Sequence, residues 1–290
     1  MKKTLSLILA IVTIVSSVFC FASCGKTGDV AKVIDIELST EEYAYCFGKE
    51  NTELLGKMNE YLAQIKADGT FDEICNHYFS DDGVPVKTAS ATEDSSKQQL
   101  IVATATGFEP FEMVDESGNF YGIDLEIAAG FAAYLGWEVV YKDMEFKAVV
   151  ESVQSGKCNI GMAGLTVTEA RKEIVTFSDS YYNASQVLVV KGDCTEFDNC
   201  KTADDVVAIL NTKTEKTLIG CQQGTTGELY IDGDADQEDG YGFPGLPVTK
   251  KAYTYVALAV TAMKNNQIDY VIVDNAPAKA VVKKINAANQ

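Results

Sequence analysis

The sequence contains little histidine, proline or tryptophan, with 1 His, 5 Pro and 1 Trp among 290 residues. Because His77 is the sole imidazole, a histidine-rich metal centre or a catalytic histidine pair cannot form. The 8 cysteines include no Cys-x-x-Cys pair. We therefore expect no metal site, no cofactor and no catalytic residues.

Positive charge is also scarce. Lys and Arg number 24 against 42 Asp and Glu, a net charge of −18. Such a balance repels nucleic acid and anionic lipid, so we expect no nucleic-acid partner. The 47% hydrophobic and 10% aromatic content is typical of a globular protein long enough for one large or two medium domains.

Long hydrophobic runs are absent except at the start of the chain. Lys2 and Lys3 precede an apolar stretch from Thr4 to Phe19, which is typical of a signal peptide over residues 1–23. A membrane anchor is the alternative, but the run is shorter than the ~20 residues a span needs. Residues 21–24 resemble a bacterial lipobox, which predicts lipidation of Cys24 and anchoring to the outer face of the cell membrane, with plain secretion as the alternative.

Two local patterns suggest other chemistry. Cys194 and Cys200 are close enough in sequence to bridge a short loop, and export would permit a disulfide, although both residues could equally be reduced. The acidic stretch Asp232–Gln237 invites a calcium interpretation. Gln237 stands where an EF-hand needs glycine and Phe243 where it needs glutamate, so we expect a solvated loop.

From Leu100 onward, short apolar runs alternate with amphipathic helices, which predicts α/β layers around a largely parallel sheet. Asp124 is the expected N-cap of one helix. The expected strands are 100–104, 137–141, 159–163, 186–190, 217–221 and 270–273, and the expected helices are 124–135, 148–154, 168–174, 202–210, 255–264 and 276–285, with a helix after the turn at 224–227.

The N-terminal part needs a partner to fold against. Val33–Leu38 and Tyr43–Phe47 are expected strands, and Thr52–Ala67 and Phe71–Tyr78 are expected helices. Fewer than about 50 residues make a marginal core on their own. Residues 80–99, rich in Ser, Thr, Asp and Lys, are interpreted as a flexible linker that lets this part dock, with two tethered domains as the alternative.

Several motifs after Leu100 resemble those of the family 3 extracellular solute-binding proteins, which bind polar amino acids for ABC importers. They are Ala103–Glu112, Tyr121–Leu125, Met144–Phe146, Ala163–Arg171 followed by Phe177–Tyr182, Gln223–Gly227 and Val273–Pro277. The resemblance implies an α/β, two-lobe periplasmic-binding-protein-like (type II) fold with two hinge strands.

Residues 32–79 resemble the end of that family's sequence, including a second hinge near Thr40–Tyr43. The resemblance therefore implies a circular permutation, in which residues 80–99 join the ancestral C- and N-termini. On this hypothesis, residues 24–40 and 190–290 form lobe 2, and residues 41–189 form lobe 1. A permutation of this kind requires ancestral ends that lie near one another.

The family motifs also imply the binding site. Arg171 would grip the ligand carboxylate, helped by N–H groups near Thr166 and near Thr225 and Thr226. Asp274 and the Gly164 carbonyl would take the ammonium, Phe108 and Phe146 would sandwich the side chain, and Gln222 would add a variable polar contact. Each has a structural alternative: a solvated Arg171, Asp274 as a helix N-cap, and core packing for both phenylalanines.

Ala105 is the informative departure. Relatives that take basic or amide amino acids commonly have Asp there, and an unpaired ligand charge in a closed cleft is costly. The sequence therefore favours a neutral or polar amino acid over lysine and arginine.

The expected mechanism is hinge closure around the ligand, followed by delivery to a membrane permease. Three alternatives remain open: a cyclohexadienyl-dehydratase-like enzyme on the same fold, an amino-acid sensor, and a swapped dimer in which exchange between chains completes the lobes.

Overall fold

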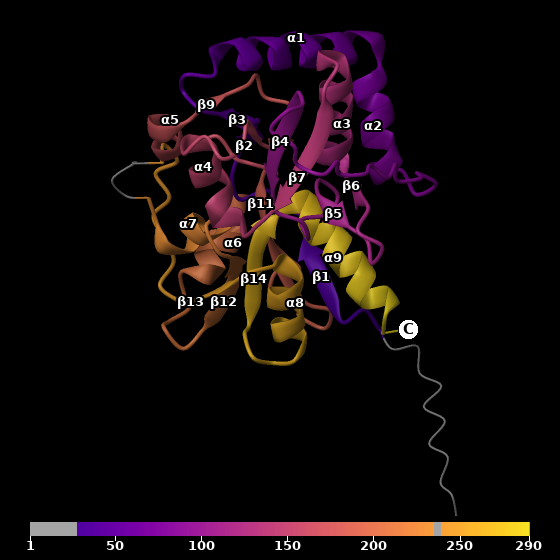
Figure 1. Cartoon of the computed structure of the whole chain (residues 1–290). Helices are drawn as coiled ribbons and strands as arrows, with labels where there is room; N and C mark the ends of the chain where they lie inside the picture. The colour runs from indigo at the N-terminus through magenta and orange to yellow at the C-terminus, as the bar shows by residue number, and fades with distance from the viewer. Residues whose placement is uncertain (1–27, 235–238, 290) are drawn as a thin grey trace, which may run out of the picture.

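The computed structural model describes residues 28–234 and 239–289, so Cys24 and the signal peptide lie outside the described residues. Figure 1 shows two lobes, one above the other. Within the described ranges, each helix is too short or too polar to cross a lipid bilayer.

The first lobe is built on a five-stranded sheet in the order β7-β4-β8-β3-β9. Its strands are β7 (Glu138–Asp143), β4 (Gln99–Thr104), β8 (Ile160–Gly161), β3 (Cys46–Phe47) and β9 (Thr176–Phe177). Its helices are α1 (Thr52–Asp68), α2 (Thr70–Phe79), α3 (Ile123–Leu135), α4 (Phe146–Gln154) and α5 (Glu169–Ile174), and a small hairpin is formed by β5 (Met113–Val114) and β6 (Phe120–Tyr121).

The second lobe is built on another five-stranded sheet, in the order β1-β11-β14-β12-β13. Its strands are β1 (Ala31–Ile34), β11 (Gln186–Lys191), β14 (Tyr270–Asp274), β12 (Leu218–Gln222) and β13 (Thr249–Tyr253). Its helices are α6 (Ala203–Leu210), α7 (Thr226–Asp232), α8 (Val256–Lys264) and α9 (Asn275–Ala287). The α/β, two-lobe fold predicted from the sequence is confirmed.

Both sheets are mixed rather than largely parallel. The strands of the βαβ units pair in parallel, as β4 does with β7 and β8, and β12 with β13 and β14. The strands next to the hinge pair antiparallel, since β1 and β14 flank β11, while β8 and β9 flank β3. A chain that crosses from one lobe to the other enters each sheet against the direction of its βαβ strands.

The hinge is a short antiparallel pair of β2 (Glu41–Tyr43) and β10 (Tyr182–Ala184). Directly beside it, the Leu38 N–H donates to the Gln186 carbonyl at 2.8 Å, and the Gln186 N–H donates to the Ser39 hydroxyl at 2.8 Å. All of β11 pairs within the second sheet. The boundary predicted between Val189 and Val190 is therefore wrong, because the chain leaves the first lobe before Gln186.

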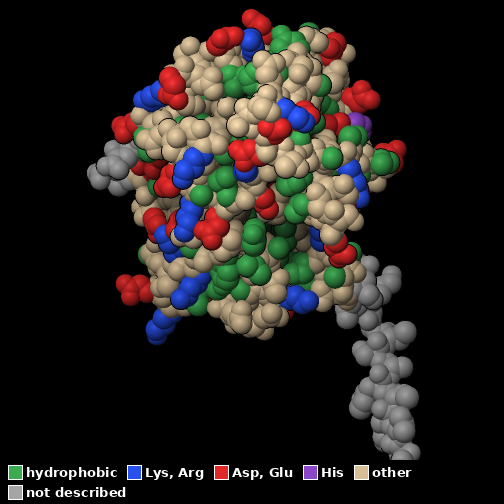
Figure 2. All heavy atoms as spheres, in the orientation of Figure 1, with side chains coloured by type: hydrophobic (Ala, Val, Ile, Leu, Met, Phe, Trp, Pro, Cys, Tyr) green, Lys and Arg blue, Asp and Glu red, His purple; other side chains and the backbone are tan. Residues whose placement is uncertain are grey.

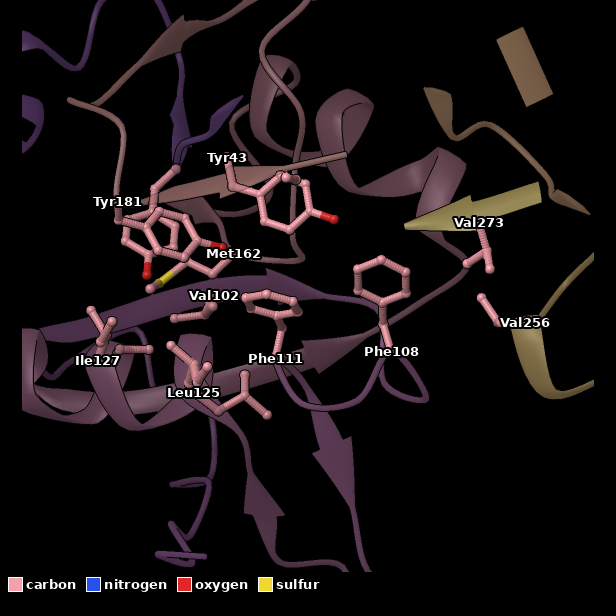
Figure 3. Close-up of a cluster of buried hydrophobic side chains, with 14 of the residues drawn as sticks. Tyr43, Val102, Phe108, Phe111, Leu125, Ile127, Met162, Tyr181, Val256 and Val273 are labelled. Carbon is pink, nitrogen blue, oxygen red and sulfur yellow. The ribbon is translucent and has the colours of Figure 1, made fainter. Parts of the chain in front are cut away.

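Aromatic side chains pack where the hinge meets the first lobe. Tyr43 and Phe111 lie edge to face at 5.2 Å, and Tyr45 stacks on Tyr181 at 4.3 Å. In Figure 3, Phe108 extends from this cluster toward Val273 and Val256 of the second lobe. The core is thus continuous across the hinge, and this continuity ties the position of one lobe to that of the other.

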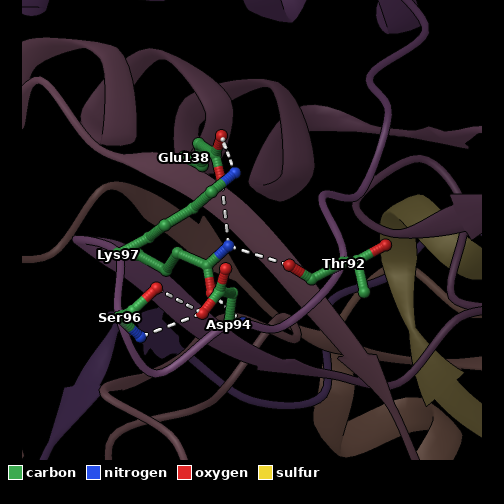
Figure 4. A network of polar contacts seen from close by, with 6 residues as sticks. Thr92, Asp94, Ser96, Lys97 and Glu138 are labelled. Carbon is green, nitrogen blue, oxygen red and sulfur yellow. Dashed lines mark hydrogen bonds and ion pairs between the residues drawn. The ribbon is translucent and has the colours of Figure 1, made fainter.

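Residues 80–98 do not behave as the flexible linker that their composition predicts. Thr88 exchanges backbone hydrogen bonds of 2.7 and 3.0 Å with Phe120, and the Ala91 N–H donates to the Val139 carbonyl at 2.8 Å. The Gln99 amide donates to the Thr92 carbonyl and to Glu138, both at 2.9 Å, and Figure 4 shows Thr92 and Glu138 in this network of polar contacts. Backbone pairing with the first lobe therefore holds this segment in place despite its polar composition.

The two ends of the described chain lie side by side. In Figure 1, β1 runs beside α9, although the two are at opposite ends of the colour scale. The Asn286 carboxamide accepts from the N–H groups of Val30 and Ala31 at 3.0 and 3.1 Å and donates to the Ala31 carbonyl at 2.9 Å. This side chain therefore closes the second lobe between segments at opposite ends of the sequence.

The remaining local predictions need corrections: the strand predicted over Val33–Leu38 ends at Ile34, and the one predicted over Tyr43–Phe47 is divided between β2 and β3. Asp124 is not the N-cap of α3, because Gly122 occupies that position at a φ of 128°. A side chain there would collide with the Phe111 carbonyl oxygen at 2.2 Å. The six described cysteines, Cys194 and Cys200 included, are all free.

Candidate ligand-binding site

The residues that the sequence motifs singled out meet between the two lobes, next to the hinge. Arg171 lies in α5 of the first lobe, and Asp274 ends β14 of the second. Thr166 precedes α5, while Thr226 begins α7. The fold thus brings side chains that are far apart in the sequence to the surface where the two lobes meet.

Arg171 makes contacts with both lobes. Its guanidinium donates to the Thr166 carbonyl at 2.6 Å in its own lobe and to the Gly224 carbonyl at 3.0 Å in the other. The ring of Phe146 lies 5.4 Å from the guanidinium carbon, a cation–π distance. Burial lowers the pKa of Arg171, but an arginine remains charged at neutral pH. The structure therefore presents one fixed positive charge at this interface.

Asp274 is the acidic counterpart on the second lobe. It is 4% exposed, and its carboxylate accepts a hydrogen bond of 2.6 Å from the Tyr43 hydroxyl. Figure 3 shows the Tyr43 hydroxyl pointing toward the strand that contains Val273. Burial and, to a lesser extent, the nearby charge of Glu41 raise the pKa of Asp274 to about 7, although the Tyr43 hydrogen bond opposes both. Near neutral pH this carboxyl can therefore gain or lose a proton.

Thr166 and Thr226 face each other across the lobes, with their hydroxyl oxygens 3.4 Å apart. Both donate to one carboxylate, that of Glu41, at 2.9 and 2.6 Å. Glu41 belongs to the hinge strand β2 and is 1% exposed. Sequence reasoning placed this residue at a hinge but missed it as part of the site. The available signal was a charged residue within the predicted hinge Thr40–Tyr43.

Gly164 packs against Phe108, whereas Phe146 belongs to a separate apolar cluster. The Gly164 N–H donates to Asp124 at 2.9 Å, and its φ of 53° favours glycine. A Cβ at Gly164 would meet the Phe108 ring at 2.7 Å, so the close approach also requires glycine. Phe108 and Phe146 are 5% and 9% exposed, and Ala105 packs in the same apolar cluster as Phe146.

On the second lobe, Gln222 and Thr225 lie at the end of β12 and the start of α7. The Thr225 hydroxyl donates to the Gln222 carbonyl at 2.8 Å, which closes the turn between these elements. The Gln222 side-chain oxygen is buried and has no hydrogen-bond partner. It is therefore an acceptor that no group in residues 28–234 and 239–289 satisfies.

Two further carboxyl groups lie behind the site and were not predicted to belong to it. Burial raises the pKa of Asp124 to about 7, whereas the hydrogen bond from Gly164 opposes that shift. Glu112 is fully buried, and neither of its carboxyl oxygens has a partner. Its burial raises its pKa well above the usual value, and the charges of Asp124 and Asp274 add to the effect. We therefore treat Glu112 as a neutral group.

One hollow adjoins Asp274, and a larger one begins at the next residue, Asn275. A cavity of about 70 Å³ lies against Asp274, Tyr43 and Ser185. A larger groove of about 690 Å³ runs between α9 and residues of the first lobe, including Phe79 and Pro110. In Figure 2, hydrophobic side chains gather on the lower half of the visible face, where α8 and α9 lie.

The sequence profile of the bacterial extracellular solute-binding proteins, family 3, matches residues 100–288. The chain belongs to this family. The match begins at β4 and includes Arg171, Thr226 and Asp274, and it does not extend over β1, β2 and β3, which complete the two sheets.

Relatives of known ligand agree with this family assignment. An arginine-binding extracellular protein of Bacillus subtilis is 34% identical over 106 residues, which cover 37% of this chain and 41% of the relative. A probable histidine-binding protein of Neisseria gonorrhoeae is 26% identical over 198 residues, covering 68% of this chain and 66% of the relative. The match therefore spans less than two thirds of the length of each relative.

A solved structure shares both sequence and fold. The truncated, arginine-bound form of an arginine-binding protein from T. maritima is 33% identical, with a TM-score of 0.51 over 64% of this chain and 78% of that one. Another neighbour, 28% identical with a TM-score of 0.52, is an ancestral amino-acid-binding protein described as a precursor of cyclohexadienyl dehydratase. Proteins of this family serve amino-acid transport and are not enzymes as a class.

Proposed function

We propose that this family 3 protein binds a free amino acid outside the cytoplasm and delivers it to the permease of an ABC importer. The observation that supports this most is the pair of opposite charges on the two lobes. Arg171 of the first lobe suits a carboxylate, and Asp274 of the second suits an ammonium. A ligand that contacts both groups stabilises the closed arrangement, since the open one cannot make both contacts.

The ligand would lie between these charges, with its side chain against Phe108 and Phe146. Thr166, Thr226 and the Gly164 carbonyl would complete the polar contacts, and Gln222 offers a buried acceptor without a partner. The contact of Arg171 with Gly224 spans the lobes at 3.0 Å, so a ligand carboxylate that binds Arg171 would meet both lobes there.

We further propose that the ligand has a neutral or polar side chain. The relatives named above bind arginine or histidine, but Ala105 offers no carboxylate to a cationic side chain and is itself only 4% exposed. A screen of the twenty amino acids and cystine by thermal shift tests this preference, because a ligand specific for the folded state raises the melting midpoint. Arginine or lysine as the best ligand would contradict it.

Arg171→Met is the decisive test of the binding mode. Removing the guanidinium leaves the ligand carboxylate without its charged partner, so we expect the affinity for the best amino acid to fall roughly 100-fold by titration calorimetry. Lys172→Met, on the next residue of α5, removes an exposed lysine that pairs with Glu169 and is the matched control. An Arg171 variant with unchanged affinity would refute the proposal.

We also propose that Cys24 is lipidated and holds the protein at the outer face of the membrane. Two acyl chains on one residue are enough for stable anchoring. Incorporation of labelled palmitate that is lost in Cys24→Ala would support this; equal labelling of the variant would contradict it.

A further inference from the structure

Glu41 is a buried carboxylate whose hydrogen-bond partners among the described residues are all neutral groups. One oxygen accepts from the Ser39 hydroxyl at 2.6 Å and from the Gln186 carboxamide at 3.1 Å. Ser39 lies on one hinge crossing and Gln186 begins β11 on the other. Through this oxygen, Glu41 joins the two crossings of the chain between the lobes.

The other oxygen of Glu41 joins the lobes themselves. It accepts from Thr166 of the first lobe at 2.9 Å and from Thr226 of the second at 2.6 Å. The two threonine hydroxyls are only 3.4 Å apart. Rotating the lobes away from each other must separate these hydroxyls, so Glu41 can hold both of them only in the closed arrangement.

The charge of Glu41 also sets the direction of these hydrogen bonds. An ionised carboxylate only accepts, so each threonine must direct its single hydroxyl hydrogen toward Glu41. The Thr226 oxygen in turn accepts from the Gln186 carboxamide at 3.2 Å. The free lone pairs of the Thr166 oxygen can then only accept a hydrogen bond from whatever lies in the site.

We propose that Glu41 is the positioning residue of the site: it draws the two lobes together through Thr166 and Thr226 and makes the Thr166 hydroxyl an obligate acceptor toward the ligand. This inference rests on the proposed function and narrows it to ligands that present a hydrogen-bond donor, the ammonium, at this point. An analogue with a hydroxyl in place of the ammonium lacks the positive charge that would pair with Asp274. Its hydroxyl also has a single hydrogen, so it can donate to Thr166 or to Asp274 but not to both.

Glu41→Gln tests whether Glu41 fixes the direction of the hydrogen bonds that the two threonines make. The glutamine keeps the size of the side chain, but its amide nitrogen donates, so a threonine can accept from it and turn its own hydrogen toward the ligand. The probes are L-alanine with lactic acid, and L-phenylalanine with phenyllactic acid, titrated by calorimetry. We expect the preference for the amino acid over its hydroxy analogue to fall roughly tenfold in Glu41→Gln.

Glu42→Gln is the matched control, because Glu42 is the next residue of β2 and its side chain is exposed. We expect it to keep the preference of the unchanged protein. If Glu41→Gln lowers the affinity for the amino acid and for its hydroxy analogue by the same factor, Glu41 has a role in stability alone. That result would overturn the proposal that Glu41 makes Thr166 an acceptor toward the ligand.

A second measurement needs no ligand. Small-angle scattering of the unliganded protein compares Glu41→Ala with Glu42→Ala, and we expect a larger radius of gyration for the former only. Equal radii would overturn the role of Glu41 in lobe closure. The scattering measurement separates the two proposals. A protein that binds no amino acid would contradict the proposed function, but its radius of gyration would still test the role of Glu41 in lobe closure.

Discussion

At the scale of single residues, the site is unusual in placing more acidic than basic groups beside the proposed ligand. Asp274 and Glu41 lie together at the hinge, Glu112 and Asp124 lie behind them, and Arg171 is the one cation we assign to the site within the described residues. Burial makes the charged form of each acid costly unless donors satisfy it. Four neutral donors satisfy Glu41, whereas Glu112 has none.

The affinity for an amino acid should therefore depend on pH through Asp274. Its pKa is raised to about 7, mainly by burial; its titratable neighbours are the charged Glu41, the neutral carboxyl of Glu112 and the phenols of Tyr43 and Tyr182. A protonated Asp274 must release its proton to pair with an ammonium. We expect affinity to rise up to tenfold per unit of pH below about 7 and to level off above it.

Calorimetry at pH 6.5 in two buffers of different ionisation enthalpy measures this proton release directly. Asp274→Asn should bind more weakly and lose that dependence on the buffer. Stronger binding of the unchanged protein at pH 5.5 than at pH 7.5 would run against the expected sign.

At the scale of elements, the loop after α7 connects the two lobes on the side of Arg171. The Tyr241 hydroxyl donates to the Val167 carbonyl at 3.0 Å, and the Glu169 N–H donates to the Asp239 carbonyl at 3.1 Å. Asp234 orders the base of this loop by accepting from the N–H groups of Tyr241 and Gly242 at 2.9 and 3.0 Å. Through Asp239 and Tyr241, this loop therefore holds the second lobe against the first, next to Arg171.

Tyr241→Phe should weaken ligand binding without destabilising the lobes. The change removes one hydrogen bond between the lobes, and we expect a threefold to tenfold loss of affinity for the best amino acid, corresponding to about 0.5–1.5 kcal/mol. Titration calorimetry measures the affinity, and urea unfolding checks that stability stays the same. Tyr134→Phe, which alters a 44% exposed tyrosine on α3, is the control. Equal affinities of the two variants would exclude a role of the loop in closure.

At the scale of the whole molecule, the order of the chain is its distinctive feature. The family profile covers residues 100–288, yet β1 completes the second sheet and β3 lies inside the first, between β8 and β9. We propose a circular permutation, because residues 80–99 follow the surface of the first lobe while Asn286 bonds to Val30 and Ala31. Contacts rather than chain order hold the fold, so permutation at exposed loops is tolerated.

A variant with the ancestral order restored should fold and bind as this chain does. Its termini would open between Gly83 and Val84, and a short Gly/Ser linker would join Asn289 to Gly28, since Asn286 already lies 3.0 Å from Val30. We expect the same preferred amino acid in a thermal-shift screen and a stability within about 1 kcal/mol, because loop-closure entropy changes slowly with loop length. A variant that does not fold would contradict the permutation hypothesis.

Many elements of both lobes could be predicted from sequence because they bury a periodic apolar pattern, whereas the largely polar strand β13 was missed. The stripe of α1 at Met58, Leu62 and Ile65 and the apolar runs of β4 and β14 are confirmed as buried. The mixed direction of the sheets could not be predicted, since an apolar run does not tell which neighbour a strand pairs with. The fixed structure of residues 80–98 was also not predicted. It depends on backbone hydrogen bonds to Phe120 and Val139, and amino-acid composition does not reveal such bonds.

The sequence by itself determined the chemistry available to this protein: one arginine and one aspartate in recognisable motifs, aromatic walls, and an alanine where a carboxylate would select basic ligands. Only the tertiary structure decided that Glu41 lies between Thr166 and Thr226 and that Asn286 meets Val30. These contacts join residues more than a hundred positions apart in the sequence. Local sequence propensity depends on near neighbours, so it cannot predict which distant residues folding brings together.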